Sequence, residues 1–295
     1  MTIKTTAADG IGTLTLDRPP LNILSRAMLA ELRDGLGEMA AREDVRVLLL
    51  RAEGEHFSAG ADVGEHLPPE FEEMIPEFLD TIRAIDAFPL PVIAAVQGRC
   101  LGGGFELVQA ADVVVAGRGA LFGQPEIVLG VSAPAACALL PTLVPRSLAA
   151  EILLTGDPMT AECALQAGLA GLVVDDDRLE EAARTLAQRM ARHSGAALRL
   201  TKKALRAGLS AAREAALRES GRIYTEELMH TADAVEGLRA FVEKRTPEWT
   251  GRWTKSGRFP SGGTRPWRTC CTKSGSSSRT PTSRPCSAGA RRAGK

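Results

Sequence analysis

Two glycine-containing stretches in the first half of the chain are suited to binding an oxygen that gains negative charge. HFSAGAD (56–62) follows one apolar run, and CLGGGFE (100–106) follows another. Consecutive glycines leave backbone N–H groups unshielded, and a helix that begins there adds positive potential at its N-terminus. The spacing matches neither a dinucleotide fingerprint, nor a phosphate-binding P-loop, nor a GxSxG elbow, so nucleotide and serine-hydrolase folds are not supported.

Two glutamates accompany these stretches and could supply proton-transfer chemistry. Glu106 lies in the first turn of the helix that the glycines open, and Glu126 lies in FGQPEIVLG (122–130). Two carboxyl groups in one cavity can divide general-acid and general-base work between them. A glutamate in the first turn of a helix also has a purely structural explanation, because its charge complements the helix dipole. Spacing alone favours that structural explanation.

The elements that must position these residues follow an alternating pattern. Residues 2–17 predict a hairpin, Ser25 can cap a helix that runs to about Arg42, and VRVLLLRA (45–52) predicts a strand buried on both faces. The next predicted elements are a helix carrying Ile75, Phe78, Leu79, Ile82 and Ile85, a strand over 91–98, a helix over 102–111 and a strand over 112–117.

This order predicts a mostly parallel sheet with right-handed crossovers. Loops at the carboxyl ends of neighbouring parallel strands line one crevice, so both glycine stretches are expected to face the same cavity. Residues 53–69 are loop-like, and residues 134–245 predict helices interrupted by one short strand over 169–176. No internal repeat is present.

Three motifs in one order, HFSAGAD, PVIAAVQGRCLGGGFEL and FGQPEIVLG, resemble the enoyl-CoA hydratase (crotonase) family. The similarity extends over residues 3–250 and includes ADAVEGLRAFVEKR (232–245). The resemblance implies an α/β fold, a crotonase-like ββα spiral core with mostly parallel sheets over residues 1–193, which holds the active site. A helical C-terminal trimerisation region is expected over residues 194–250. Family members are usually trimers or dimers of trimers.

The resemblance also implies a role for each residue of the site. The N–H groups of Ala61 and Gly103 correspond to the oxyanion hole, which binds the thioester oxygen as it becomes enolate-like. Glu106 corresponds to the base that takes a proton from the attacking water. Glu126 corresponds to the residue that holds this water and gives a proton to the α-carbon. The residues implied in binding coenzyme A and substrate are Leu21, Ala59, Gly60, Asp62, Gly102, Pro125 and Pro134.

The implied function is that of an enoyl-CoA hydratase-type lyase, which adds water to an α,β-unsaturated acyl-CoA. Hydratases keep both glutamates, whereas relatives that isomerise double bonds or cleave other acyl-CoA bonds often lack one. The resemblance implies no cofactor, because coenzyme A enters as part of the substrate. An isomerase or thioester hydrolase on the same fold, and an inactive acyl-CoA binder, are the alternatives.

A narrower resemblance concerns the acyl group. FGQPEIVLGVSAPAACALLP (122–141), with Pro134 where hydratases usually carry a glycine-rich segment, is similar to cyclohexa-1,5-dienecarbonyl-CoA hydratases, as are HFSAGADVGEHLP (56–68) and residues 224–245. Ala59 and Asp62 fit the general hydratase pattern better. Proline and alanine in place of glycine add bulk near the acyl tail, which would change the acyl groups that fit. A cyclic dienoyl-CoA is therefore the expected substrate, and the alternative is a short- or medium-chain enoyl-CoA of fatty-acid β-oxidation.

Charge is distributed unevenly along the chain. Residues 251–295 contain eleven Lys and Arg and no Asp or Glu, which leaves a formal net charge of about −11 on the first 250 residues. This tail has no hydrophobic periodicity, so we expect it to be disordered, and its abrupt composition is typical of a cloning or reading-frame artefact. It could instead be a basic arm for nucleic acid, but the acidic body makes a nucleic-acid partner unfavourable.

The remaining composition predicts a cytoplasmic enzyme that has neither a membrane-spanning segment nor a metal site. No run approaches the ~18 apolar residues that a membrane helix needs, and the first ten residues lack the features of a signal or transit peptide. The six cysteines have neither disulfide-framework nor zinc spacing, which is typical of a reducing compartment. The four histidines show no i, i+4 pair, so no metal site is expected.

Overall fold

A strand buried on both faces lies at the centre of the main sheet. The computed structural model describes residues 2–253, and in it VLLLRA forms β3 (Val47–Ala52). Leu48 and Leu50 face one hydrophobic core cluster, whereas Val47 and Leu49 face a second one on the other side. Because side chains alternate along a strand, this double burial explains why the apolar run is unbroken.

The main sheet has six strands in the order β1-β2-β3-β4-β6-β9. β1 and β2 form the predicted antiparallel hairpin, with Ile3 opposite Leu16, and every later neighbour pairs in parallel. The mostly parallel sheet is therefore confirmed. The other strands of this sheet are β1 (Ile3–Ala8), β2 (Ile11–Leu16), β4 (Val92–Val96), β6 (Val113–Gly117) and β9 (Leu172–Val174).

A second, three-stranded sheet was not predicted. It contains β5 (Arg99–Leu101), β7 (Leu121–Gly123) and β8 (Met159–Thr160), with β5 parallel and β8 antiparallel to β7. The prediction of a single strand within 134–245 was thus wrong, because β8 also lies there. Strands of two or three residues are too short to show a period in the sequence, and only their partners define them.

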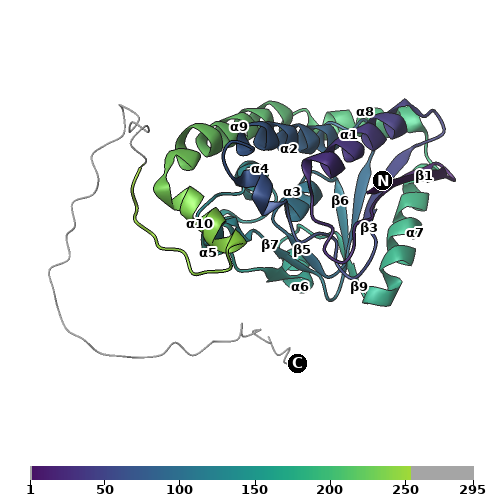
Figure 1. Cartoon of the computed structure of the whole chain (residues 1–295). Coiled ribbons are helices and arrows are strands. Elements are labelled where there is room, and N and C mark those ends of the chain that lie inside the picture. The colour runs from purple at the N-terminus through teal and green to yellow at the C-terminus, as the bar shows by residue number, and fades with distance from the viewer. Residues whose placement is uncertain (1, 254–295) are drawn as a thin grey trace, which may run out of the picture. The chain divides into compact units, whose positions relative to one another are not determined.

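Helices cover both faces of the main sheet (Figure 1). One long helix, α7, packs on the face that carries Val47 and Leu49. Another, α1, begins at the predicted cap, since the Ser25 hydroxyl accepts a hydrogen bond from the N–H of Met28. The α-helices are α1 (Arg26–Ala41), α2 (Phe71–Asp86), α3 (Gly103–Gln109), α4 (Pro134–Leu139), α5 (Arg146–Thr155), α6 (Ala161–Gln166), α7 (Leu179–Ala191), α8 (Gly195–Arg206), α9 (Ser210–Arg222) and α10 (Ala232–Val242).

Short helical turns fill several connections, including part of the predicted loop over 53–69. The 3₁₀ turns are η1 (Val63–His66), η2 (Pro125–Leu129), η3 (Leu140–Thr142), η4 (Asp176–Arg178) and η6 (Leu228–His230), and η5 (Ile223–Glu227) is a π-helical turn that continues α9. Two of them, η1 and η2, contribute residues to the site described below.

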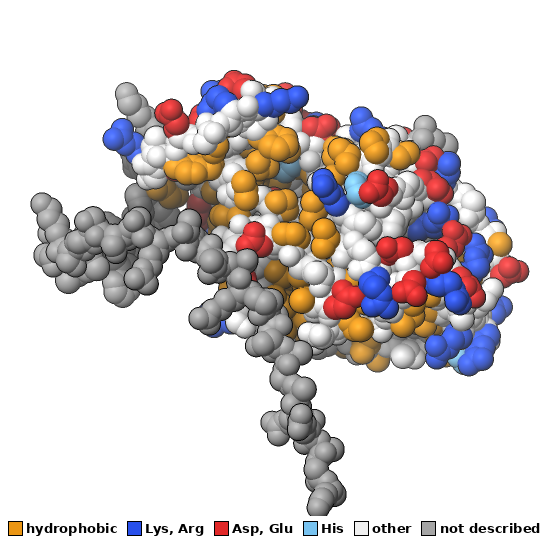
Figure 2. All heavy atoms as spheres, turned by 90° about the horizontal axis from the view of Figure 1, so that it is seen from below, with side chains coloured by type: hydrophobic (Ala, Val, Ile, Leu, Met, Phe, Trp, Pro, Cys, Tyr) orange, Lys and Arg blue, Asp and Glu red, His pale blue; other side chains and the backbone are white. Residues whose placement is uncertain are grey.

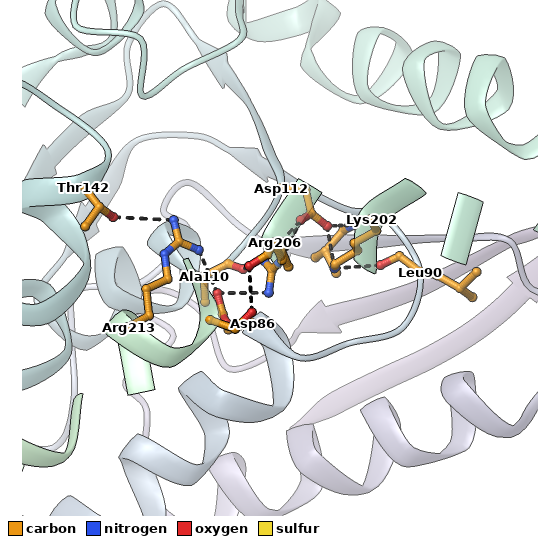
Figure 3. A network of polar contacts seen from close by, with 10 residues as sticks. Asp86, Leu90, Ala110, Asp112, Thr142, Lys202, Arg206 and Arg213 are labelled. Carbon is orange, nitrogen blue, oxygen red and sulfur yellow. Dashed lines mark hydrogen bonds and ion pairs between the residues drawn. The ribbon is translucent and has the colours of Figure 1, made fainter. Parts of the chain in front are cut away.

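Buried ion pairs join the C-terminal helices to the sheet-containing part (Figure 3). Lys202 on α8 pairs with Asp112 and donates to the carbonyl oxygen of Leu90 at 2.8 Å. Arg206 on the same helix contacts Asp112 at 3.1 Å and Asp86 at 3.0 Å, and Arg213 on α9 also reaches Asp86 at 3.0 Å. The predicted boundary between residues 193 and 194 lies between α7 and α8. α8 is the first helix that these ion pairs attach to the sheet-containing part.

Residues that follow α10 fold back along it. Asp233 accepts hydrogen bonds from the N–H groups of Thr250 and Gly251, each at 2.8 Å, and Thr231 forms an antiparallel bridge with Trp253. The first three residues of the predicted tail over 251–295 are thus held against α10. Residues 254–295 lie outside the described residues.

Candidate functional site

The loop that carries HFSAGAD is held between two neighbouring segments. On one side, Leu24 donates to the carbonyl oxygen of Gly60 and accepts from the N–H of Asp62, both at 3.0 Å. On the other side, Ser58 pairs with Cys100 of β5, and the N–H of Leu101 donates to the Ser58 carbonyl oxygen at 2.9 Å. The loop is therefore positioned by residues from both sides and not by its own sequence alone.

The N–H groups of Ala61 and Gly103 lie close together. Because Gly60 and Asp62 bond to Leu24, the N–H of Ala61 between them faces the opposite side of this extended stretch. Gly103 lies on that side, and a Cβ atom built on it would be 3.3 Å from the Ala61 nitrogen. Gly103 is also the first residue of α3, so its N–H has no partner within the helix. The backbones of two separate loops thus approach each other at Ala61 and Gly103.

Two buried polar side chains, those of Asn22 and Ser58, stabilise this arrangement. The Asn22 side chain donates to the carbonyl oxygens of Glu53 and His56 at 2.9 and 2.8 Å. The Ser58 hydroxyl donates to the carbonyl oxygen of Asn22 at 2.9 Å and accepts from the N–H of Gly60 at 3.1 Å. Nothing in the isolated sequence marks Asn22, because the carbonyl groups to which its side chain donates lie more than thirty residues away.

Glu106 is buried between α3 and α4. Its side chain is only 3% exposed, and its Oε1 accepts a hydrogen bond from the N–H of Ala136 at 2.9 Å. Ala133, the residue that precedes α4, has no side chain able to cap that helix. Glu106 therefore satisfies one of the free N–H groups in the first turn of α4.

Glu126 lies in η2 and faces Gly102. A Cβ atom at Gly102 would stand 2.7 Å from Oε1 of Glu126, so this position needs glycine for space as well as for its φ of +53°. With its amide nitrogen turned toward Glu126, Gln124 donates to the two carboxyl oxygens at 3.0 and 3.2 Å. The Gln124 oxygen then accepts from Gln109 at 2.9 Å. These two buried glutamines were not predicted, since amides are common in sequences and only burial singles them out.

One cavity contains both glutamates. It encloses about 570 Å³ of space between atoms, including its open mouth. Nine of the predicted site residues line it, namely Ala59, Gly60, Ala61, Gly102, Gly103, Glu106, Pro125, Glu126 and Pro134. The other walls are mainly apolar and come from Val63, Met74, Ile75, Phe78, Leu129, Val131 and Leu238, with Ser132 and His66 as further polar residues.

Two predicted residues lie beside the cavity and do not line it. The carbonyl oxygen of Leu21 accepts a hydrogen bond from the N–H of Ala59 at 2.8 Å, and the Leu21 side chain is 38% exposed. Asp62 caps η1 by accepting from the N–H of Gly64 at 2.9 Å. Both residues therefore shape the loop that borders the cavity.

Burial changes the acidity of both carboxyl groups, and to different extents. Loss of hydration raises the pKa of Glu106 to about 7, and hydrogen bonds from the N–H groups of Ala136 and Ala135 oppose this rise because they stabilise the ionised form. Loss of hydration and the nearby charge of Glu106 raise the pKa of Glu126 well above its usual value. Near neutral pH the pair is therefore able to hold one proton, with Glu106 the more easily ionised member.

His66 and Tyr224 form a further polar pair that the sequence did not reveal. His66 lines the cavity, and its ring packs edge-on against the ring of Tyr224, with centroids 6.3 Å apart. Tyr224 is fully buried, and its hydroxyl has no hydrogen-bond partner among the described residues. Its pKa is raised by burial and by the charges of Glu126 and Glu106, which places it near the two glutamates.

Neither a metal centre nor a membrane-spanning helix is found in residues 2–253. No three His, Cys, Asp or Glu side chains in this part of the chain are grouped so that they could hold a metal ion. Within the same residues, every helix is too short or too polar to cross a bilayer.

Comparisons with known proteins agree with this geometry. Residues 6–252 match the family described as enoyl-CoA hydratase/isomerase. The cyclohexa-1,5-dienecarbonyl-CoA hydratase of Thauera aromatica is 39% identical over 239 residues, which cover 81% of this chain and 92% of that protein. The 2,3-dehydroadipyl-CoA hydratase of Escherichia coli is 40% identical over 242 residues, with 81% of this chain and 94% of that protein covered.

A solved structure shows the same fold. The crystal structure of an enoyl-CoA hydratase from Mycobacterium avium subsp. paratuberculosis superposes with a TM-score of 0.77 at 30% identity, covering 85% of this chain and 99% of the other. The crotonase-like fold and the family resemblance predicted from the three motifs are thus confirmed. The chain belongs to the enoyl-CoA hydratase/isomerase family and is an enzyme of the enoyl-CoA hydratase type.

Proposed function

We propose that this protein adds water across the α,β-double bond of an acyl-CoA thioester, with Ala61 and Gly103 as the oxyanion hole and Glu106 and Glu126 as base and acid. The observation that carries the proposal is the convergence of two backbone amides and two buried carboxyl groups on one cavity. Preorganised donors stabilise an oxygen that becomes enolate-like, and removing one such donor typically costs about 3 kcal/mol of transition-state stabilisation.

The difference in acidity assigns the two glutamates to different steps. Glu106, whose ionised form is stabilised by the N–H of Ala136, takes a proton from water as the water oxygen bonds to the β-carbon. The π electrons move onto the thioester oxygen held by the two amides. When this enolate collapses, the α-carbon takes a proton from the protonated carboxyl group of Glu126. A proton passed from Glu106 to Glu126 through solvent restores the starting state.

Coenzyme A is the part of the substrate that extends from the cavity mouth. Ala59 lines the cavity and is bonded to the partly exposed Leu21, so both lie where the thioester arm would leave the protein. Asp62 holds η1 and thereby orients the loop that carries Ala61. In this proposal Leu21 and Asp62 contribute to coenzyme A binding, and Asp62 does so by positioning the loop.

The acyl group is proposed to be a cyclic dienoyl group such as cyclohexa-1,5-dienecarbonyl. Apart from the glutamates, the cavity walls are mostly hydrocarbon, and Pro134 adds rigid bulk where it lines the cavity. Such walls suit an uncharged ring. The similarity to the Thauera aromatica hydratase supports the same substrate class.

A panel of unsaturated CoA thioesters tests this proposal. We expect the purified enzyme to hydrate a cyclic dienoyl-CoA with a higher kcat/KM than crotonyl-CoA, and each product to gain the mass of one water. A higher kcat/KM for crotonyl-CoA would contradict the cyclic substrate and favour a general short- or medium-chain hydratase. A product of unchanged mass would instead identify an isomerase.

A further inference from the structure

The cavity contains one polar side chain whose chemistry the hydration step does not use. His66 ends η1 and lines the cavity together with Val63, Met74 and Leu238. Its Nδ1 lies 2.9 Å from the carbonyl oxygen of Asp62. A carbonyl oxygen only accepts hydrogen bonds, so Nδ1 must carry the proton, and in the neutral ring Nε2 is then an acceptor.

A second residue, Tyr224, packs against the imidazole and restricts its orientation. The ring of Tyr224 packs against it at an interplanar angle of 61°, and Tyr224 itself has no exposed surface. Among the described residues, none donates a hydrogen bond to Nε2. Burial also lowers the pKa of His66, which keeps the ring uncharged at neutral pH. His66 therefore lines the cavity as a neutral imidazole without a positive charge.

Because of the charges around the cavity, the neutral state of His66 affects charged and uncharged acyl groups differently. No lysine or arginine is found among the described residues that line the cavity, and its two ionisable acids are Glu106 and Glu126. A carboxylate on the acyl group would meet a neutral imidazole and two acids in a poorly hydrated space, without a cation to offset its charge. Like charges brought together in this way cost several kcal/mol.

We propose that position 66 determines specificity: with a neutral side chain there and no cation on the wall, the cavity accepts only acyl groups without a carboxylate. This inference rests on the proposed hydratase function, but it holds whether the acyl group is cyclic or linear. It separates the enzyme in substrate class from its relative named as a 2,3-dehydroadipyl-CoA hydratase, although the two chains are 40% identical.

Two substrates of equal chain length test the inference. 2-Hexenoyl-CoA and 2,3-dehydroadipyl-CoA both have six acyl carbons and differ in the terminal carboxylate. The wild type is expected to favour 2-hexenoyl-CoA by at least about tenfold in kcat/KM. His66→Lys and His66→Arg should each shift this ratio at least about tenfold toward the dicarboxylic substrate, because they bring a cation to the wall. His66→Gln is the matched control, since it is polar and uncharged, and its ratio should stay close to that of the wild type.

A binding measurement on the unaltered protein decides the question if the variants do not fold. Calorimetric titration with hexanoyl-CoA and adipoyl-CoA, which cannot be hydrated, should give a Kd at least about tenfold lower for hexanoyl-CoA. Equal affinities, or folded Lys and Arg variants that retain the wild-type ratio, would overturn the role of His66. Because binding needs no turnover, this outcome is distinct from a failure of the proposed hydration, which would appear as no product from any thioester.

Discussion

The two glutamates of the cavity are held by different partners, and in the proposed mechanism this difference divides their roles. Glu106 accepts a hydrogen bond from the backbone of α4, which favours its ionised form. Loss of hydration and the nearby charge of Glu106 raise the pKa of Glu126, which favours its protonated form. The proton that hydration requires is thus stored on one carboxyl group while the other remains free to act as a base.

Replacing Glu106 by glutamine is predicted to lower activity and raise stability. General acid–base catalysis contributes about 10²–10⁴-fold to rate, so kcat should fall by that order. The folded-state pKa of about 7 exceeds the unfolded value near 4.5, so the folded state binds more protons between these values. The free energy of unfolding of the wild type therefore decreases as pH rises from about 4.5 to 7. Glu106→Gln cannot ionise at this position and so avoids this loss. The difference in the free energy of unfolding between the variant and the wild type should therefore grow from pH 5 to pH 8.

Steady-state kinetics and urea denaturation at the two pH values check this prediction. Glu126→Gln should behave in the same way, because the pKa of Glu126 is also raised. Glu38→Gln, on the exposed face of α1, serves as the control. Wild-type turnover in either active-site variant, or an advantage that shrinks as pH rises, would contradict the assignment.

At the scale of elements, the C-terminal part of the chain contributes to the cavity wall and to its support. Leu238 on α10 lines the cavity, and Tyr224 in η5 supports His66. Arg213 on α9, the helix that η5 continues, is joined to the core through its ion pair with Asp86, and Lys202 and Arg206 join α8 to it. The ion network therefore anchors the helix that leads to Tyr224.

Asp112→Asn is predicted to destabilise the protein strongly. Asp112 is the partner of both Lys202 and Arg206, and the variant would leave these buried cations with too little negative charge. Breaking a buried pair in this way typically costs 3–5 kcal/mol. Asp80→Asn removes the exposed ion pair with Arg83 and should have little effect. Equal, small changes in the free energy of unfolding measured in urea would show that the network does not stabilise the fold.

At the scale of the whole molecule, one face carries a group of exposed hydrophobic side chains. Figure 2 shows them gathered over part of this face, whereas charged side chains crowd another part. The exposed large hydrophobic residues include Leu121, Ile127, Val128, Leu154, Phe241 and Trp249. Exposed apolar patches of this kind often mark interfaces between subunits.

We therefore predict that the protein assembles as a homotrimer or a dimer of trimers. Light scattering coupled to gel filtration should give a mass of three or six chains. Val128→Asp combined with Leu154→Asp should reduce this mass, because both side chains are more than half exposed in the single chain. Thr185→Asp on the exposed face of α7 is the control. A monomeric wild type at micromolar concentration would contradict the prediction.

Local pattern in the sequence determined the long elements and the family. The hairpin, the Ser25 cap and the buried run of β3 were predicted because each leaves a signal within a few neighbouring residues. The three motifs identified the family because their order and separation are preserved along one chain. The second sheet and the ordered residues 251–253 were missed, since their hydrogen-bond partners are distant in sequence.

Tertiary structure alone decided how the residues of the cavity act. That the amides of Ala61 and Gly103 meet depends on bonds to Leu24 and β5, and the unequal acidity of the glutamates depends on burial and on α4. The role proposed for His66 depends on its contacts with Asp62 and Tyr224, which the sequence does not show. Periodicity reports which residues are adjacent along the chain, whereas hydration and charge depend on which residues are adjacent in space.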